Sequence, residues 1–68
     1  MTDTVKLLEA IQNKGLKRGY IAEKLGIDRS TLWKKVTNQS EFTASEITAL
    51  TDMLGLTKSD RDKIFFNV

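Results

Sequence analysis

Apolar residues recur at intervals of three and four along most of this sequence, which is the spacing that gathers side chains on one face of an α-helix. The first such segment covers residues 4–14, and its apolar face consists of Val5, Leu7, Leu8 and Ile11. Thr2 or Asp3 can cap its first turn, and Gly15 can end it because glycine readily adopts the left-handed conformation that closes many helices. The pattern therefore predicts a first helix over 4–14.

Residues 18–36 read as two short helices joined by a tight turn at Gly26. Asp28 is a suitable N-cap for the second of these helices, because its carboxylate can accept hydrogen bonds from the free backbone N–H groups of the first turn. Leu32 and Val36 stand four apart and give this helix a narrow buried stripe. Its remaining surface carries polar side chains and one aromatic ring, in Arg29, Ser30, Trp33, Lys34 and Thr37. A helix with this pattern is suited to present side chains to a partner.

The start of the first helix of this pair, near Lys17 or Arg18, is unfavourable. No Ser, Thr or Asp stands at the cap, and Gly19 in the first turn costs up to about 1 kcal/mol relative to Ala. Two interpretations of Gly19 stay open. Either it lets the backbone approach another group closely, such as a phosphate, or it is tolerated at a helix end.

The second half of the chain predicts two more helices. Asn38 is a plausible left-handed terminator of the helix before it. Thr43 and Glu46 form the pattern of a capping box, which predicts the start of a fourth helix that Gly55 ends. A short fifth helix follows and finishes with Ile64, Phe65 and Phe66. Two adjacent aromatic rings cannot both face one core from a short helix, so either one of them is exposed and can contact a second chain, or both fold over the edge of the core.

Composition narrows the class of protein. A chain of 68 residues forms one small domain, over residues 1–68, and it has no Cys, His or Pro. Disulfides, thiolate chemistry and zinc sites built from Cys or His are therefore excluded, and we expect no metal, cofactor or catalytic residues. No apolar run is long enough to cross a membrane and no signal-peptide pattern is present, so we expect a soluble intracellular protein. The helical spacing and the absence of Pro favour an all-α fold, a compact bundle of about five short helices.

The net charge of +2 hides an uneven distribution of charge. The segment 14–35 holds seven of the eleven basic residues but only two of the nine acidic ones. Such clustering around the two-helix unit points to a polyanionic partner, although a solvated basic face is the simpler alternative. For Lys24 alone, we prefer the solvated interpretation.

The two-helix unit resembles the helix-turn-helix of phage repressors and Cro proteins, the lambda-repressor-like family. The resemblance rests on Ile21-Ala22, on Leu25-Gly26-Ile27, and on Leu32 and Val36. The five-helix layout is similar to the same family in bacteria and their phages, and the ending Asp62-Lys63-Ile64-Phe65-Phe66 is similar to small regulators of Gram-positive phages. The chain departs from the family at Lys17, where Ser or Thr is usual, and at Arg18, where Gln is usual.

The resemblance implies that the helix over about 29–37 enters the major groove of operator DNA and regulates transcription, as in a lysis–lysogeny switch. The residues that would read bases are Arg29, Ser30, Trp33 and Lys34. Those that would meet phosphates are Lys17, Arg18, Lys35, Thr37, Asn38 and Gln39. The location implied is the cytoplasm of a bacterial host cell.

Several alternatives remain open at this stage. Trp33 can instead fold inward as part of the core. So small a domain is expected to form a weak or DNA-induced homodimer, and the exposed part of Ile64, Phe65 and Phe66 is the candidate contact. The alternative function is a protein-interaction module that binds a co-encoded repressor. An enzyme is disfavoured, because Asp60 and Asp62 are two apart on a short helix and point to different faces.

Overall fold

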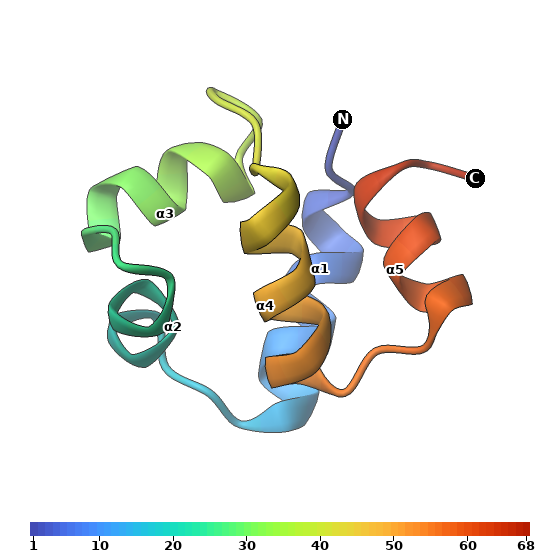
Figure 1. Cartoon of the computed structure of the whole chain (residues 1–68), viewed down its shortest axis with the longest axis horizontal. Coiled ribbons are helices and arrows are strands. Elements are labelled where there is room, and N and C mark those ends of the chain that lie inside the picture. Colours follow the sequence, from blue (N-terminus) through green and yellow to red (C-terminus); the bar gives the residue numbers. More distant parts are fainter.

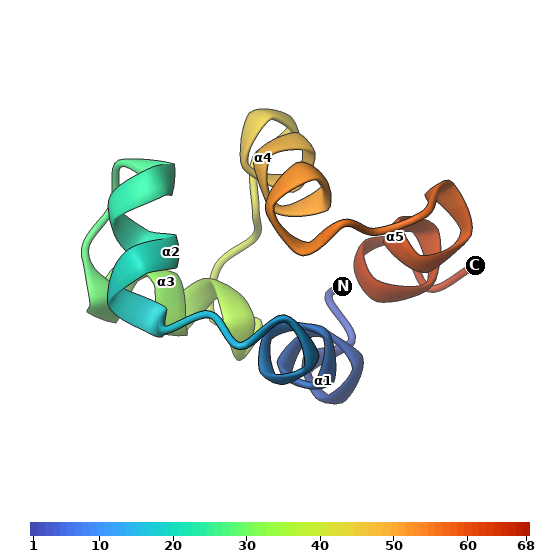
Figure 2. The same cartoon turned by 90° about the horizontal axis from the view of Figure 1, so that it is seen from below.

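The computed structural model describes all residues from Met1 to Val68 and confirms the all-α prediction (Figure 1). It contains five helices and no strands: α1 Thr4–Lys14, α2 Arg18–Leu25, α3 Arg29–Val36, α4 Ala44–Leu54 and α5 Lys58–Phe65. The α2–α3 pair forms one end of the molecule and α5 the other, with α1 and α4 between them (Figures 1 and 2). None of these helices combines the length and the apolar content that crossing a bilayer requires.

The helix boundaries follow local sequence signals. Asp3, Asp28, Thr43 and Thr57 each accept a hydrogen bond from a backbone N–H of the helix they precede. The capping box of Thr43 and Glu46 is present in full, as predicted. The exception is α2, whose cap position is Lys17 and which has no side-chain cap. Its weak start, visible in the sequence, is therefore a property of the fold.

The core is a single cluster of ten buried residues contributed by all five helices and the α3–α4 loop. They are Leu7, Ile21, Ala22, Leu32, Val36, Phe42, Leu50, Leu54, Ile64 and Phe65. Both apolar residues of the predicted α3 stripe belong to it, with Leu32 2% and Val36 1% exposed. The core therefore fixes which face of α3 turns outward.

The adjacent aromatics at the end of α5 separate into one buried and one exposed ring. Phe65 packs edge-to-face on Phe42, with ring centroids 5.6 Å apart, whereas Phe66 is 52% exposed. Ile64 is buried as well. Of the candidate contact residues Ile64, Phe65 and Phe66, only Phe66 is exposed enough to meet a partner, and the contact itself stays a prediction.

The N-terminal segment ties the end of α3 to the end of α5. Asn38, left-handed as predicted (φ 66°), accepts a hydrogen bond from the Thr2 N–H (2.9 Å) and donates one to the Thr2 carbonyl (2.8 Å). The Thr4 hydroxyl donates to the Val36 carbonyl at 2.6 Å. On the other side, the Asp3 N–H donates to the Ile64 carbonyl at 2.7 Å. The C-terminal end of α3 is thus held by side chains as well as by packing.

Candidate nucleic-acid interface

The N-terminal turn of α3 is organised by Asp28. Its carboxylate accepts hydrogen bonds from the Thr31 N–H (2.7 Å) and from the Ser30 hydroxyl (3.0 Å). These bonds, with the Thr31 N–H first, favour the ionised form and lower the pKa of Asp28 below its ordinary value. With Leu32 and Val36 buried behind it, this turn exposes Arg29, Ser30 and Lys34. Three of the four predicted base-reading residues therefore share the outer surface of α3.

The bond to Asp28 also fixes the chemistry that Ser30 can offer. A hydroxyl carries one proton and two lone pairs, and the proton is already donated to the carboxylate. What Ser30 presents outward is therefore an acceptor. In the major groove, such a group suits the amino groups of cytosine or adenine better than the acceptor atoms of guanine.

Trp33 lies differently from the other three predicted readers. It is half-buried against the core, and the Arg18 guanidinium lies 4.1 Å from the centre of its ring. The ring also lines a groove of about 380 Å³ beside Leu8, Ile11 and Leu16. The partial burial of Trp33 favours its interpretation as a packing residue, and its role as a base reader stays a prediction.

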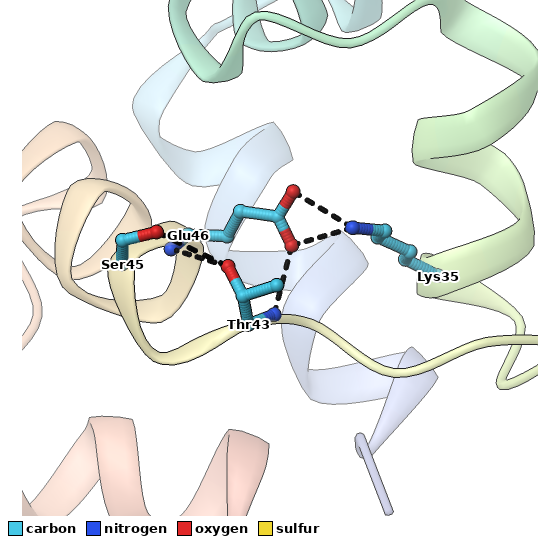
Figure 3. Close-up of polar contacts among 4 residues, drawn as sticks. All are labelled: Lys35, Thr43, Ser45 and Glu46. Carbon is cyan, nitrogen blue, oxygen red and sulfur yellow. Dashed lines mark hydrogen bonds and ion pairs between the residues drawn. The ribbon is translucent and has the colours of Figure 1, made fainter.

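Lys35 points inward, toward α4. Its ammonium lies 2.6 and 2.7 Å from the two carboxylate oxygens of Glu46, and the two side chains are only 13% and 11% exposed (Figure 3). The same carboxylate accepts a hydrogen bond from the Thr43 N–H at 2.8 Å. The expectation that Lys35 meets a phosphate is corrected, because its charge is neutralised inside the protein. Glu46 therefore joins the capping box of α4 to the middle of α3.

Glu46 titrates below its ordinary range because of these partners. Burial alone would raise the pKa of its carboxyl group. The hydrogen bond from Lys35, the backbone hydrogen bond from Thr43 and the attraction of the Lys35 charge outweigh burial and lower the pKa below 4.5. The Glu46 carboxyl group is therefore ionised at neutral pH.

The remaining predicted phosphate-contacting residues divide into two groups. Lys17, Arg18 and Gln39 are exposed. The Thr37 hydroxyl donates to the Trp33 carbonyl at 2.8 Å, and the Asn38 amide is bound to Thr2. The Thr37 hydroxyl is thus used to finish α3 and the Asn38 amide to hold Thr2, and the predicted phosphate contacts of both residues stay predictions.

The sequence predicted that Arg29, Ser30 and Lys34 face outward, but it gave no sign of two contacts between helices. The Lys35–Glu46 pair joins residues that are eleven positions apart in the chain, so no local sequence pattern predicts it. The Arg29 guanidinium lies against Gly19 of α2, another contact between helices. The sequence marked Gly19 as unusual in a first turn and left open a close approach to another group, but it could not identify Arg29 as that group.

The rest of the surface offers less organised chemistry. The largest groove, of about 480 Å³, lies between α1 and the α4–α5 connection and mixes Lys6, Lys14 and Lys63 with Glu9 and Asp60. No group of three or more Asp, Glu, His or Cys side chains is placed to hold a metal ion. On the α2–α3 surface the exposed basic residues outnumber the exposed acidic ones: Lys17, Arg18, Lys24, Arg29 and Lys34 against Glu23 and Asp28.

No family model, curated protein or solved structure matches this chain in comparisons with each. Functional inference therefore rests on the geometry of its own residues.

Proposed function

We propose that this chain is a transcriptional regulator that binds operator DNA through α3, in the manner of phage repressors and Cro proteins. The observation that carries the proposal is the outward face of α3, where Arg29, Ser30 and Lys34 are exposed. The opposite face is held in the core by Leu32 and Val36, which are at most 2% exposed. An α-helix with its side chains is about 10–12 Å across, which fits a major groove about 12 Å wide.

The proposed contacts follow from the donors and acceptors of this face. Arg29 and Lys34 would donate to the O6 and N7 acceptors of guanine, while Ser30 would accept from an amino group. Lys17 and Arg18, at the start of α2, and Gln39, just beyond the end of α3, would meet phosphates on either side. Such contacts set orientation and affinity without reading sequence.

Dimensions favour a loose dimer on DNA. Half-sites one helical turn apart are centred about 34 Å from each other. The longest extent of the chain is 28 Å, so two copies at that spacing would meet only at their edges. We therefore propose a weak or DNA-induced homodimer, acting in the cytoplasm of a bacterial host as part of a lysis–lysogeny type switch.

To test the proposal, the protein is used to select duplexes from a random-sequence pool. Its affinity for the selected duplex is then measured. Lys34→Ala should weaken binding by about 5- to 150-fold, equivalent to about 1–3 kcal/mol for a base contact. Lys58→Ala, an exposed lysine on α5, is the matched control and should leave affinity unchanged. Equal losses from both variants would refute the docking face.

One observation favours a second function, docking on a co-encoded repressor. Phe66 is 52% exposed and stands between two grooves, of about 150 and 440 Å³, that also expose parts of Phe42 and Ile47. Size-exclusion chromatography can distinguish the two functions. The protein is run by itself, then mixed with a selected duplex, and then mixed with the co-encoded regulator. If the protein bound the regulator but not the duplex, docking on a repressor would become the preferred function.

A further inference from the structure

The guanidinium of Arg29 occupies the space that a side chain at position 19 would fill. A Cβ placed on Gly19 would lie 2.6 Å from Nη2, 2.9 Å from Nε and 3.1 Å from Cζ of Arg29. The first two distances are shorter than real Cβ contacts and the third is unusually tight, so a side chain at position 19 would displace the guanidinium. The first turn of α2 is therefore the surface on which the end of Arg29 rests.

Backbone conformation does not explain this glycine. Gly15, Gly26 and Gly55 all have positive φ, where glycine is favoured, but Gly19 does not. It stands in the first turn of a helix, where Ala would be more favourable by up to about 1 kcal/mol. The feature that distinguishes position 19 is its contact with Arg29.

The Arg29 side chain makes no ion pair with any residue of the chain. Its contact with the first turn of α2 is one of close packing, and it exists because position 19 has no side chain. Arg18 does not compete for it, since its own guanidinium lies over the Trp33 ring at 4.1 Å. A single added methyl group should suffice to displace Arg29.

We propose that Gly19 is a positioning residue for Arg29, which limits the orientations of this side chain before it meets a guanine. The inference rests on the proposed function, because it assigns Arg29 to base contact. An arginine side chain has many rotamers, and the conformational entropy that it loses when binding fixes it in one of them opposes association. Removing the resting surface should therefore weaken DNA binding without weakening the fold.

The experiment compares Gly19→Ala, Arg29→Ala and the double variant. The control is Asn13→Ala at an exposed position of α1, which also improves helix propensity. Gly19→Ala should lower affinity for the selected duplex by about 2- to 12-fold, the cost of ordering one free side chain. In the Arg29→Ala background the same change should have no effect. Thermal stability should stay the same or rise in both Gly19→Ala and Asn13→Ala, while Asn13→Ala leaves affinity unchanged.

A measurement without DNA separates this inference from the proposed function. The NMR signal of the Arg29 Nε–H should shift on Gly19→Ala and stay in place on Asn13→Ala. An unmoved signal, or an equal loss of affinity with and without Arg29, would overturn the positioning role. A shifted signal in a protein that selects no duplex would overturn the proposed function instead.

Discussion

Replacing Lys35 with Met should destabilise the fold far more than its place on a DNA-facing helix suggests. The substitution keeps most of the apolar stem but removes the ammonium that lies 2.6 Å from Glu46 Oε1. The Glu46 carboxylate cannot turn toward solvent once the ammonium is gone, because the capping box holds it in place. Its remaining partner is the Thr43 N–H at 2.8 Å. Lys35→Met would therefore leave a nearly buried negative charge.

The size of the effect follows from the burial of the pair. Removing one partner of a fully buried pair costs about 3–5 kcal/mol. Because both side chains keep some exposure, at 13% and 11%, we expect about 2–3 kcal/mol. For a domain of this size, each kcal/mol corresponds to about 4–8 °C, so the melting temperature should fall by roughly 10–20 °C. Chemical unfolding followed by circular dichroism measures the free energy, and thermal unfolding followed in the same way measures the melting temperature.

Three further variants make this prediction specific. Lys34→Met, its exposed neighbour, should change stability by no more than about 0.5 kcal/mol. Glu46→Gln should cost less than Lys35→Met, because Gln still fits a capping box and a lysine can extend its ammonium toward water. The double variant, which buries no charge, should be more stable than Lys35→Met alone. A loss below about 0.5 kcal/mol for Lys35→Met would refute the reasoning.

Two other predictions follow from the same core and its charged pair. Since the folded-state pKa of Glu46 is lowered, its contribution to stability is present above the ordinary value of 4.5 and is lost as pH falls through the folded-state pKa. Acid titration of unfolding free energy should therefore show a shallower decline in Glu46→Gln, and an unchanged slope would contradict the assignment. Phe65→Ala should cost about 3–5 kcal/mol in urea unfolding, whereas Phe66→Ala should cost less than about 1 kcal/mol. Equal costs would show that the two rings share the core.

The sequence was most informative where structure depends on neighbours in the chain. Asp28 was identified as a cap, and Thr43 with Glu46 as a capping box, because these signals span only three residues. The left-handed ends at Gly26 and Asn38 were predicted for the same reason. These local signals were enough to define the outward face of α3.

Contacts between helices were beyond the reach of those signals. Lys35 has the local pattern of a surface lysine, but α4 brings Glu46 beside it. Trp33 has the pattern of an outward residue, but it packs half-buried against the core. Which of Phe65 and Phe66 is buried depends on how α5 is rotated against Phe42. In each case the position of a second helix decides the role of a residue on the first.

The salt dependence of binding to duplex DNA tests the central claim most directly. If Lys17, Arg18 and the α3 face meet the double helix, log affinity should fall linearly with log salt, with a slope steeper than about −2. Lys17→Ala should make the slope shallower by about 0.9, whereas Lys58→Ala should leave it unchanged. An affinity that does not respond to salt, or equal slopes for the two variants, would contradict the account.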